Sequence, residues 1–257
     1  MEDLNTLPNK ESEINLEDNK NHLRLRADKI AEKYQLGESE HYYSQMVPEL
    51  NKFVLAMLDD YVTKSGYEFP DQKELTAIDF GSGHFWYYEG YKKFFEKYQK
   101  SAVGEKRQIG IMQWDSDPEI GMAGAESIIR DIYIDVSKDN REKTRDYLTK
   151  ALEEREGKKF NIVTMFAMGP GLFPIDPEIV NSSFKESISQ LSAFMAINGI
   201  LIVTTSFGGA KKQAVLSSIQ EAGLKVLLNE HNEYEELLLD AKSGFTHEDI
   251  IIAIKEK

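Results

Sequence analysis

The sequence predicts an α/β fold in which a seven-stranded, mostly parallel Rossmann-like sheet carries helices on both faces and follows an N-terminal helical extension. Short runs rich in valine, isoleucine and leucine alternate with segments of helical periodicity, an order that is typical of parallel sheets. The runs are apolar throughout, as expected of strands that are buried on both faces. The predicted strands are 75–80, 108–114, 129–134, 160–166, 200–205, 224–228 and 250–254.

The chain before the first strand divides into two parts. Residues 1–21 contain few large apolar side chains, and we expect them to be flexible. Apolar residues then recur at helical spacing over Leu23–Tyr34 and again over Pro48–Thr63. We therefore expect a helical extension or lid over 22–74, followed by one α/β domain over 75–257.

Two helices are predicted between the later strands. One apolar stripe begins at Phe184 and is followed by a stop signal at Asn198-Gly199. The other includes Val215 and Ile219 and is followed by Gly223. Each helix fills the interval between two predicted strands, as a strand–helix–strand unit requires.

The composition excludes several classes of protein. Of 257 residues, 41% are hydrophobic and 29% are charged, which is typical of a globular chain with a sizeable core. The net charge of −13 disfavours nonspecific binding to nucleic acid, which requires basic residues. Because cysteine is absent, disulfides, thiolate zinc sites and a cysteine nucleophile are excluded. No signal-peptide pattern and no apolar run of about 18 residues is present, so we expect a cytoplasmic protein that binds no membrane.

A glycine-containing segment follows the first predicted strand. Asp79 ends that strand, Gly81 and Gly83 come next, and a helical pattern begins near Tyr87. Glycines let the backbone turn tightly and approach a ligand closely, and the following helix offers its N-terminal dipole. The carboxyl end of the first strand also borders the crevice where open α/β sheets bind ligands. A plain tight turn is the alternative, and a dinucleotide fingerprint is excluded because its third glycine would fall on Trp86.

The segment D-F-G-S-G resembles motif I of the class I S-adenosylmethionine-dependent methyltransferases, whose usual form is D/E-x-G-x-G-x-G. In that family the acidic residue and the glycine loop hold the methionine end of the cofactor. The resemblance implies that Asp79, Gly81, Ser82 and Gly83 bind S-adenosylmethionine. The chain departs from the family pattern at Phe85, which stands where the third glycine is usual.

Two further acidic positions match the family's cofactor motifs. Asp115 and Ser116, at the end of the second predicted strand, resemble the motif that binds the ribose. A carboxylate suits this role because it can accept hydrogen bonds from both hydroxyls of a vicinal diol. Asp117 is more simply a helix cap. Asp135 and Val136, after the third strand, match the positions that face the adenine, although aspartate is also an ordinary turn residue there.

The fourth strand resembles the family's F-D-x-V motif, with Asn161 in place of the aspartate and Phe166 facing the cofactor. No N-P-P-[YF] signature follows this strand, which disfavours methylation of base amino groups or glutamine amides. With the fifth strand and the terminal pair, the resemblance covers roughly residues 75–257. Metal chemistry lacks support, because the five histidines form no close ligand pair.

Aromatic side chains near the glycine loop are the candidates for the acceptor site. We assign substrate binding to Tyr42, Trp86 and Tyr87, and cofactor binding to Tyr43. Tyr42 and Tyr43 belong to the N-terminal segment, which commonly covers the cofactor in small-molecule methyltransferases. The alternative is that about half of the aromatic residues near the loop are core residues at helical spacing. His84 is the candidate general base, because an imidazole at the first turn of a helix stays neutral. Packing on Trp86 is its alternative role.

The resemblance implies S-adenosylmethionine-dependent methyl transfer to the nitrogen or oxygen of a small-molecule acceptor. Two other functions stay open. The first is a non-methylating transferase of the same fold, such as an aminopropyl transferase. The second is a catalytically inactive cofactor-binding or scaffold protein, which the departures at His84, Phe85 and Asn161 would suit.

Replacement of Gly83 tests the glycine loop. A β-carbon at this position would occupy the ligand's space or require an unfavourable positive φ. We expect Gly83→Val to abolish binding of S-adenosylmethionine in calorimetry while the circular dichroism spectrum stays that of a folded protein. Normal binding by the variant would show that the loop is not the cofactor site.

Overall fold

The structure is a computed structural model, and it describes most of the predicted elements. The described residues are 10–37, 48–69, 74–80, 87–96, 108–115, 126–130, 159–168, 188–205, 209–241 and 246–257, with the single residues 149, 153, 157 and 185. Side chains of β2 and β3 lie outside this description, so these two strands are known from their backbones.

Within the described residues, seven strands form one sheet of the order β3-β2-β1-β4-β5-β7-β6. Its strands are β1 (Glu74–Phe80), β2 (Gln108–Asp115), β3 (Glu126–Arg130), β4 (Phe160–Met168), β5 (Met195–Thr205), β6 (Lys225–His231) and β7 (Asp249–Ile254). Neighbouring strands are parallel from β3 to β5, whereas β7 is antiparallel to both β5 and β6. The prediction of a mixed α/β fold with a mostly parallel sheet is confirmed.

The direction of strand addition reverses beside β1. The chain adds β2 and β3 on one side of β1 and then returns to add β4 and β5 on the other side. Such a reversal leaves a crevice at the carboxyl ends of the two central strands, where open α/β sheets bind ligands. Asp79, the second-last residue of β1, lies opposite Thr164 in the middle of β4. The topology therefore places the Asp79 region at the expected ligand crevice.

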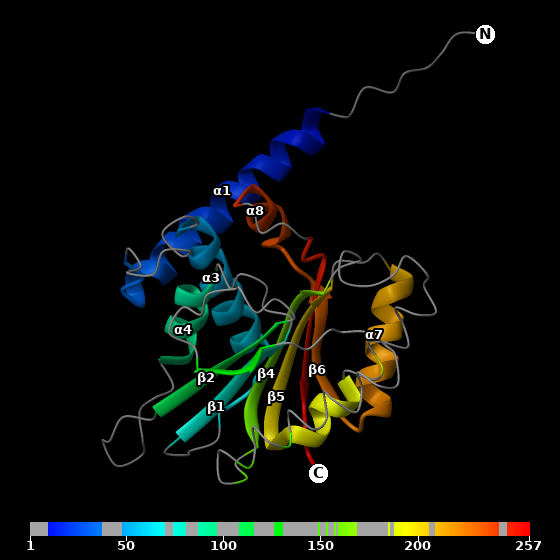
Figure 1. Cartoon of the computed structure of the whole chain (residues 1–257). Helices are drawn as coiled ribbons and strands as arrows, with labels where there is room; N and C mark the ends of the chain where they lie inside the picture. Colours follow the sequence, from blue (N-terminus) through cyan, green and yellow to red (C-terminus); the bar gives the residue numbers. More distant parts are fainter. Residues whose placement is uncertain are drawn as a thin grey trace, which may run out of the picture.

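Helices cover both faces of the sheet (Figure 1). On one face, α3 (Pro48–Lys64) and α4 (Tyr88–Glu96) share a hydrophobic cluster with the sheet, and α1 (Lys10–Lys33) and α8 (Glu235–Asp240) pack against α3. The other face packs against α7 (Gly209–Glu221) and the helical residues 188–194. Alternate residues of β4 serve the two cores, because successive side chains of a strand point to opposite faces. Ile162 and Phe166 belong to the first core, and Val163 and Met165 belong to the second.

Helix α3 is a layer of the core itself. Its side chains are buried along almost the whole helix, and they share one cluster with the strands of the sheet. Helix α1 covers the outer side of α3 with the buried residues Leu23, Ala27 and Ile30. Part of the predicted N-terminal extension therefore forms the hydrophobic core of the sheet's first face.

The boundaries of α1, β5 and β3 differ most from the sequence-based prediction. Helix α1 begins at Lys10, so residues 10–21, which we expected to be flexible, are helical. Apolar periodicity did not predict this part of α1, because the part contacts α8 through polar groups, including an ion pair between Lys20 and Glu236. Strand β5 begins at Met195, five residues before the predicted start. The backbone passes through Asn198 at a φ of 61° and stays in the sheet, whereas the sequence predicted a helix stop at this residue. Strand β3 ends at Arg130, and residues 131–134 of the predicted strand lie outside the described residues.

Helices α3 and α4 approach each other closely at Gly90. The backbone N–H of Gly90 donates a hydrogen bond to Oδ1 of Asn51 at 2.9 Å. A β-carbon on Gly90 would lie 2.0 Å from the backbone oxygen of Asn51, a distance that no real contact allows. Only glycine fits at this point without separating the two helices.

Substitution of Gly90 tests this contact. We expect Gly90→Ala to lower the free energy of unfolding by about 1–3 kcal/mol, the usual cost of overpacking a core. Urea denaturation measures the effect. Gly37→Ala is the matched control, because nothing lies within 4 Å of its added β-carbon. Equal stability of the two variants would contradict the close approach.

Candidate functional site

Asp79 is a buried acidic residue beside the crevice that the topology predicts. It is fully buried in β1, next to the carboxyl end of the strand. Its Oδ2 accepts a hydrogen bond from the hydroxyl of Tyr87 at 2.6 Å, and its Oδ1 accepts one from the hydroxyl of Thr164 at 2.5 Å. A buried carboxylate is costly unless hydrogen bonds compensate for its lost hydration, and these two donors come from different elements. Together they fix the orientation of the carboxylate.

A second tyrosine extends this network. The hydroxyl of Tyr91 lies 3.0 Å from that of Thr164. Thr164 has one proton, and its acceptor at 2.5 Å is Asp79, so Tyr91 is the donor to Thr164. Burial raises the pKa of Tyr91 well above its usual value, and the negative charge of Asp79 adds to this effect. The phenol therefore stays protonated and remains a donor.

An aromatic cluster surrounds the network. The rings of Tyr87 and Phe166 are 5.4 Å apart, and those of Tyr91 and Phe95 are 4.6 Å apart, both in edge-to-face geometry. Such pairs contribute about 0.5–1.5 kcal/mol beyond their buried area. Phe166 is buried, whereas Tyr87 is partly exposed. The cluster thus excludes water from the inner side of Asp79.

The structure brings three of the predicted site residues together, namely Asp79, Tyr87 and Phe166. Asp115 ends the adjacent strand β2, one residue beyond Trp114, which pairs with Phe80 of β1. Its backbone is therefore at the same edge of the sheet, while its side chain lies outside the description. Ten other predicted site residues lie outside the described residues: Tyr42, Tyr43, Gly81, Ser82, Gly83, His84, Trp86, Ser116, Asp135 and Val136.

Sequence reasoning missed two members of the network. Thr164 is a polar residue at the centre of a mostly apolar strand, and this was the available signal. Tyr91 was counted only among the aromatic residues near the glycine loop, because its hydroxyl partner is remote in sequence. Tyr87 was predicted to bind substrate, and the structure shows its hydroxyl on Asp79. These contacts depend on how α4 lies over β1 and β4.

A second polar cluster lies at the carboxyl end of β5. Nδ1 of His247 and the hydroxyl of Thr204 are 2.9 Å apart, and both residues are buried. Burial lowers the pKa of His247 to about 4. Two residues after His247, the carboxylate of Asp249 accepts a hydrogen bond from Lys212 of α7 at 2.7 Å. This cluster ties the start of β7 to β5 and α7.

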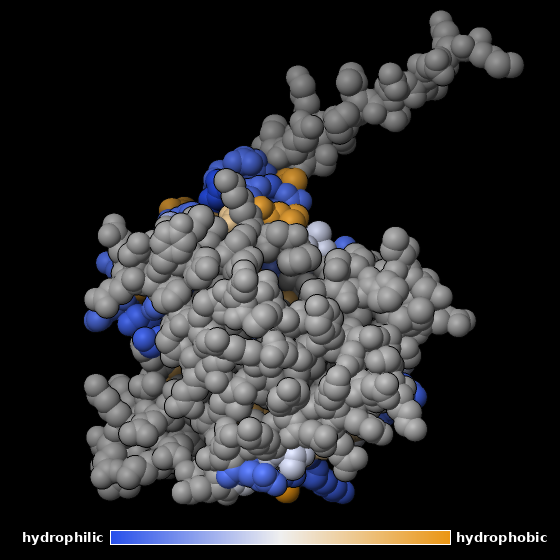
Figure 2. Space-filling model, viewed as in Figure 1, coloured by the Kyte–Doolittle hydropathy of each residue, from blue (hydrophilic) through white to orange (hydrophobic). Residues whose placement is uncertain are grey.

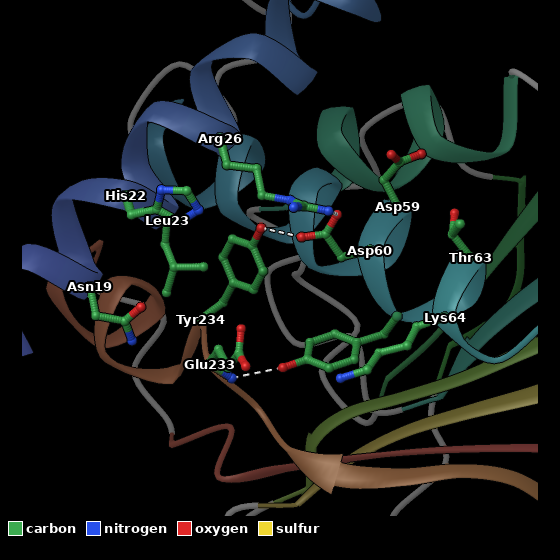
Figure 3. A pocket seen from close by; sticks show the side chains of 11 residues that line it. Asn19, His22, Leu23, Arg26, Asp59, Asp60, Thr63, Lys64, Glu233 and Tyr234 are labelled. Atoms are coloured by element: carbon green, nitrogen blue, oxygen red, sulfur yellow. Dashed lines mark hydrogen bonds and ion pairs between the residues drawn. The ribbon is translucent and has the colours of Figure 1, made fainter.

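The pocket drawn in Figure 3 lies between α1, α3 and the residues that precede α8, and it has a volume of about 410 Å³. Its polar groups are largely engaged with one another. Asp60 accepts from Arg26 and from the hydroxyl of Tyr234, both at 2.5 Å. The hydroxyl of Tyr61 accepts from the backbone of Glu233, and burial raises the pKa of this phenol to about 12. These contacts attach α1 and the chain before α8 to α3.

The surface near this pocket is mainly polar. Figure 2 shows hydrophilic side chains with a few hydrophobic ones over α1 and α8, and Leu16, Leu25 and Leu239 of these helices are exposed. No group of three potential metal ligands occurs among the described residues. In the same part of the chain, no helix is long and apolar enough to cross a membrane. Asp79 and its neighbours therefore form the best-defined candidate site.

Comparisons with protein-family models and with curated proteins gave no match. Among solved structures, the chain is similar to a putative S-adenosylmethionine-dependent methyltransferase from Streptococcus mutans (11% identity, TM-score 0.45), with 77% of this chain and 49% of that chain covered. It thus spans about half the length of that protein.

A putative class I S-adenosylmethionine-dependent methyltransferase from Listeria monocytogenes is also similar (14% identity, TM-score 0.46), with 94% and 69% covered. The corresponding values for an S-adenosylmethionine-dependent methyltransferase from Clostridium acetobutylicum are 8% identity, a TM-score of 0.44, and 80% and 92% covered. All three are named as S-adenosylmethionine-dependent methyltransferases, and only the name of the Listeria protein specifies class I. At these low identities and scores, the case for function depends on the residues of the site.

The buried state of His247 has a measurable consequence at acid pH. The unfolded chain takes up a proton at its ordinary pKa of 6.5, whereas the folded protein resists protonation until about pH 4. Stability present above pH 6.5 should therefore decrease as the pH falls toward 4, by up to about 3 kcal/mol. We expect His247→Gln to flatten this part of the pH–stability curve in urea denaturation. His22→Gln, the same substitution at an exposed histidine, is the matched control.

Proposed function

We propose that the protein transfers a methyl group from S-adenosylmethionine to the nitrogen or oxygen of a small-molecule acceptor. The observation that carries this proposal is the position of Asp79. Its buried carboxylate lies near the carboxyl end of β1, at the reversal of strand order, and Gly81-Ser82-Gly83 follow directly in the sequence. This combination of an oriented acid, a glycine loop and a switch point suits a ligand that approaches the backbone closely.

The residues at this edge fit the parts of the cofactor in a definite order. The end of β1, with Asp79, would hold the methionine end, whose ammonium group is complementary to a carboxylate. Asp115, at the end of the neighbouring strand β2, would accept hydrogen bonds from the ribose hydroxyls. Asp135 and Val136, which follow β3 in sequence, would face the adenine. Since this order leads from β3 through β2 to β1, the acceptor would lie on the side of β4 and β5.

The cofactor would supply a methyl group that is already activated by its positive sulfur. The chain's own residues would then align the acceptor and exclude water. Phe166 and Tyr87 provide apolar surface next to Asp79, and Tyr42 and Trp86 are the further aromatic candidates. A base is needed only where the acceptor atom carries a proton, and His84 is the candidate for removing it.

One departure from the family pattern lies away from this edge. Asn161 is the second residue of β4, whereas Thr164 lies opposite Asp79. At about 3.3 Å per residue, Asn161 is about 10 Å further toward the amino end of the strand. The presence of asparagine instead of aspartate at position 161 therefore does not by itself favour a catalytically inactive protein. Product turnover, as opposed to cofactor binding alone, distinguishes an enzyme from a cofactor-binding scaffold.

Calorimetry with S-adenosylmethionine and S-adenosylhomocysteine tests the cofactor site. We expect Asp115→Ala to weaken binding of both by about ten- to a hundredfold, because the ribose hydroxyls lose a charged acceptor. Asp115→Asn should have a milder effect, because it keeps one acceptor oxygen.

Asp117→Ala is the matched control, since this neighbouring aspartate is assigned to helix capping. It should bind as the wild type does. If Asp117→Ala loses affinity and Asp115→Ala does not, the ribose assignment moves to Asp117. Failure of the wild-type protein to bind either compound would refute the proposed function.

A further inference from the structure

Tyr87 is the residue that directly precedes the first turn of α4. The backbone oxygen of Tyr87 accepts a hydrogen bond from the N–H of Tyr91 at 3.0 Å, which makes Tyr87 the residue that caps the helix. Capping residues normally offer a short side-chain oxygen to the free N–H groups of the first turn. The hydroxyl of Tyr87 instead donates to Asp79. The first turn of α4 therefore needs another acceptor.

Asn51 of α3 supplies this acceptor from outside the helix. Its Oδ1 accepts the hydrogen bond from the N–H of Gly90, which belongs to the first turn of α4. Asn51 is only 2% exposed, so no water competes readily for this bond. The missing side chain at Gly90 permits the contact, because a β-carbon there would collide with the backbone of Asn51. Helix α3 thus determines the position of α4 and caps its N-terminal end.

Both hydroxyl donors to Asp79 depend on the position of α4. Tyr87 donates directly and precedes the helix by one residue. Thr164 donates from β4, and its own hydroxyl is held by Tyr91, one helical turn after Tyr87. A shift of the first turn of α4 would therefore disturb both contacts together.

We propose that Asn51 is a positioning residue of the cofactor site. It holds the first turn of α4, and through Tyr87 and Tyr91 it keeps the carboxylate of Asp79 in place. This inference rests on the proposed function, since it concerns the affinity of the same site for S-adenosylmethionine. Helix α3 thus influences the affinity for the cofactor, although Asn51 itself does not contact the cofactor.

The test compares affinity with stability. S-adenosylhomocysteine binding is measured by calorimetry, and thermal unfolding is measured on the same samples. We expect Asn51→Ala to bind about tenfold more weakly than the wild type, at a temperature where it is fully folded. Asn51→Asp keeps an acceptor oxygen next to the helix N-terminus and should recover most of the affinity. Asn51→Ser is a milder change and should weaken binding less than Asn51→Ala does. It provides the test of the inference if the alanine variant does not fold.

Asn232→Ala is the matched control. Asn232 is also a buried asparagine that contacts α3, since its Nδ2 donates to Met57, but it lies before α8 and not at α4. This variant should lose stability and keep wild-type affinity. The inference is overturned if Asn51→Ala or Asn51→Ser binds normally, or if Asn232→Ala weakens binding equally. A wild-type protein that does not bind the probe would refute the proposed function and the inference with it, and that result is distinct from normal binding by the variants.

Discussion

The need to compensate the buried carboxylate of Asp79 organises the centre of this structure. A carboxylate removed from water destabilises the fold by several kcal/mol unless hydrogen bonds replace its hydration. The chain meets this need with hydroxyls from two elements, Tyr87 before α4 and Thr164 in β4. Each of these elements is then constrained, because a hydrogen bond requires an oxygen–oxygen distance near 2.7 Å. The same carboxylate thus links the sheet to the helix that follows the glycine loop.

This constraint extends outward through the helices of the first face. Helix α4 must lie close enough for Tyr87 and Tyr91 to reach the network, and Gly90 allows α3 to pack against it at backbone contact. Helix α3 in turn is covered by α1. Ion pairs such as Arg24–Asp240 are exposed and contribute at most about 1 kcal/mol each. Burial of a side chain such as Leu23 contributes about 1.5–3 kcal/mol, so the apolar stripe holds α1 in place.

Much of the fold was predictable, because its strands and helices leave a local signature. The strands are continuous apolar runs that recur between helical segments, and β1, β4 and β7 begin within one residue of the predicted positions. The start of α1 was not predictable in this way. Its first residues are polar, and part of their contact with the fold is an ion pair with Glu236, which is more than 200 residues away in sequence. Periodicity detects only contacts that repeat along one element.

The sequence by itself determined the α/β class, because apolar runs that alternate with helical periodicity encode this class directly. It also singled out Asp79, through the resemblance of D-F-G-S-G to a known cofactor motif. The tertiary structure alone decided what surrounds Asp79. Thr164 and Tyr91 became part of the site only when β4 paired with β1 and α4 packed over both. Asn51 became the cap of α4 only when α3 came within contact distance of Gly90. The physical reason is that a buried polar group must find its partner in space, and the partner's distance along the chain carries no information about that choice.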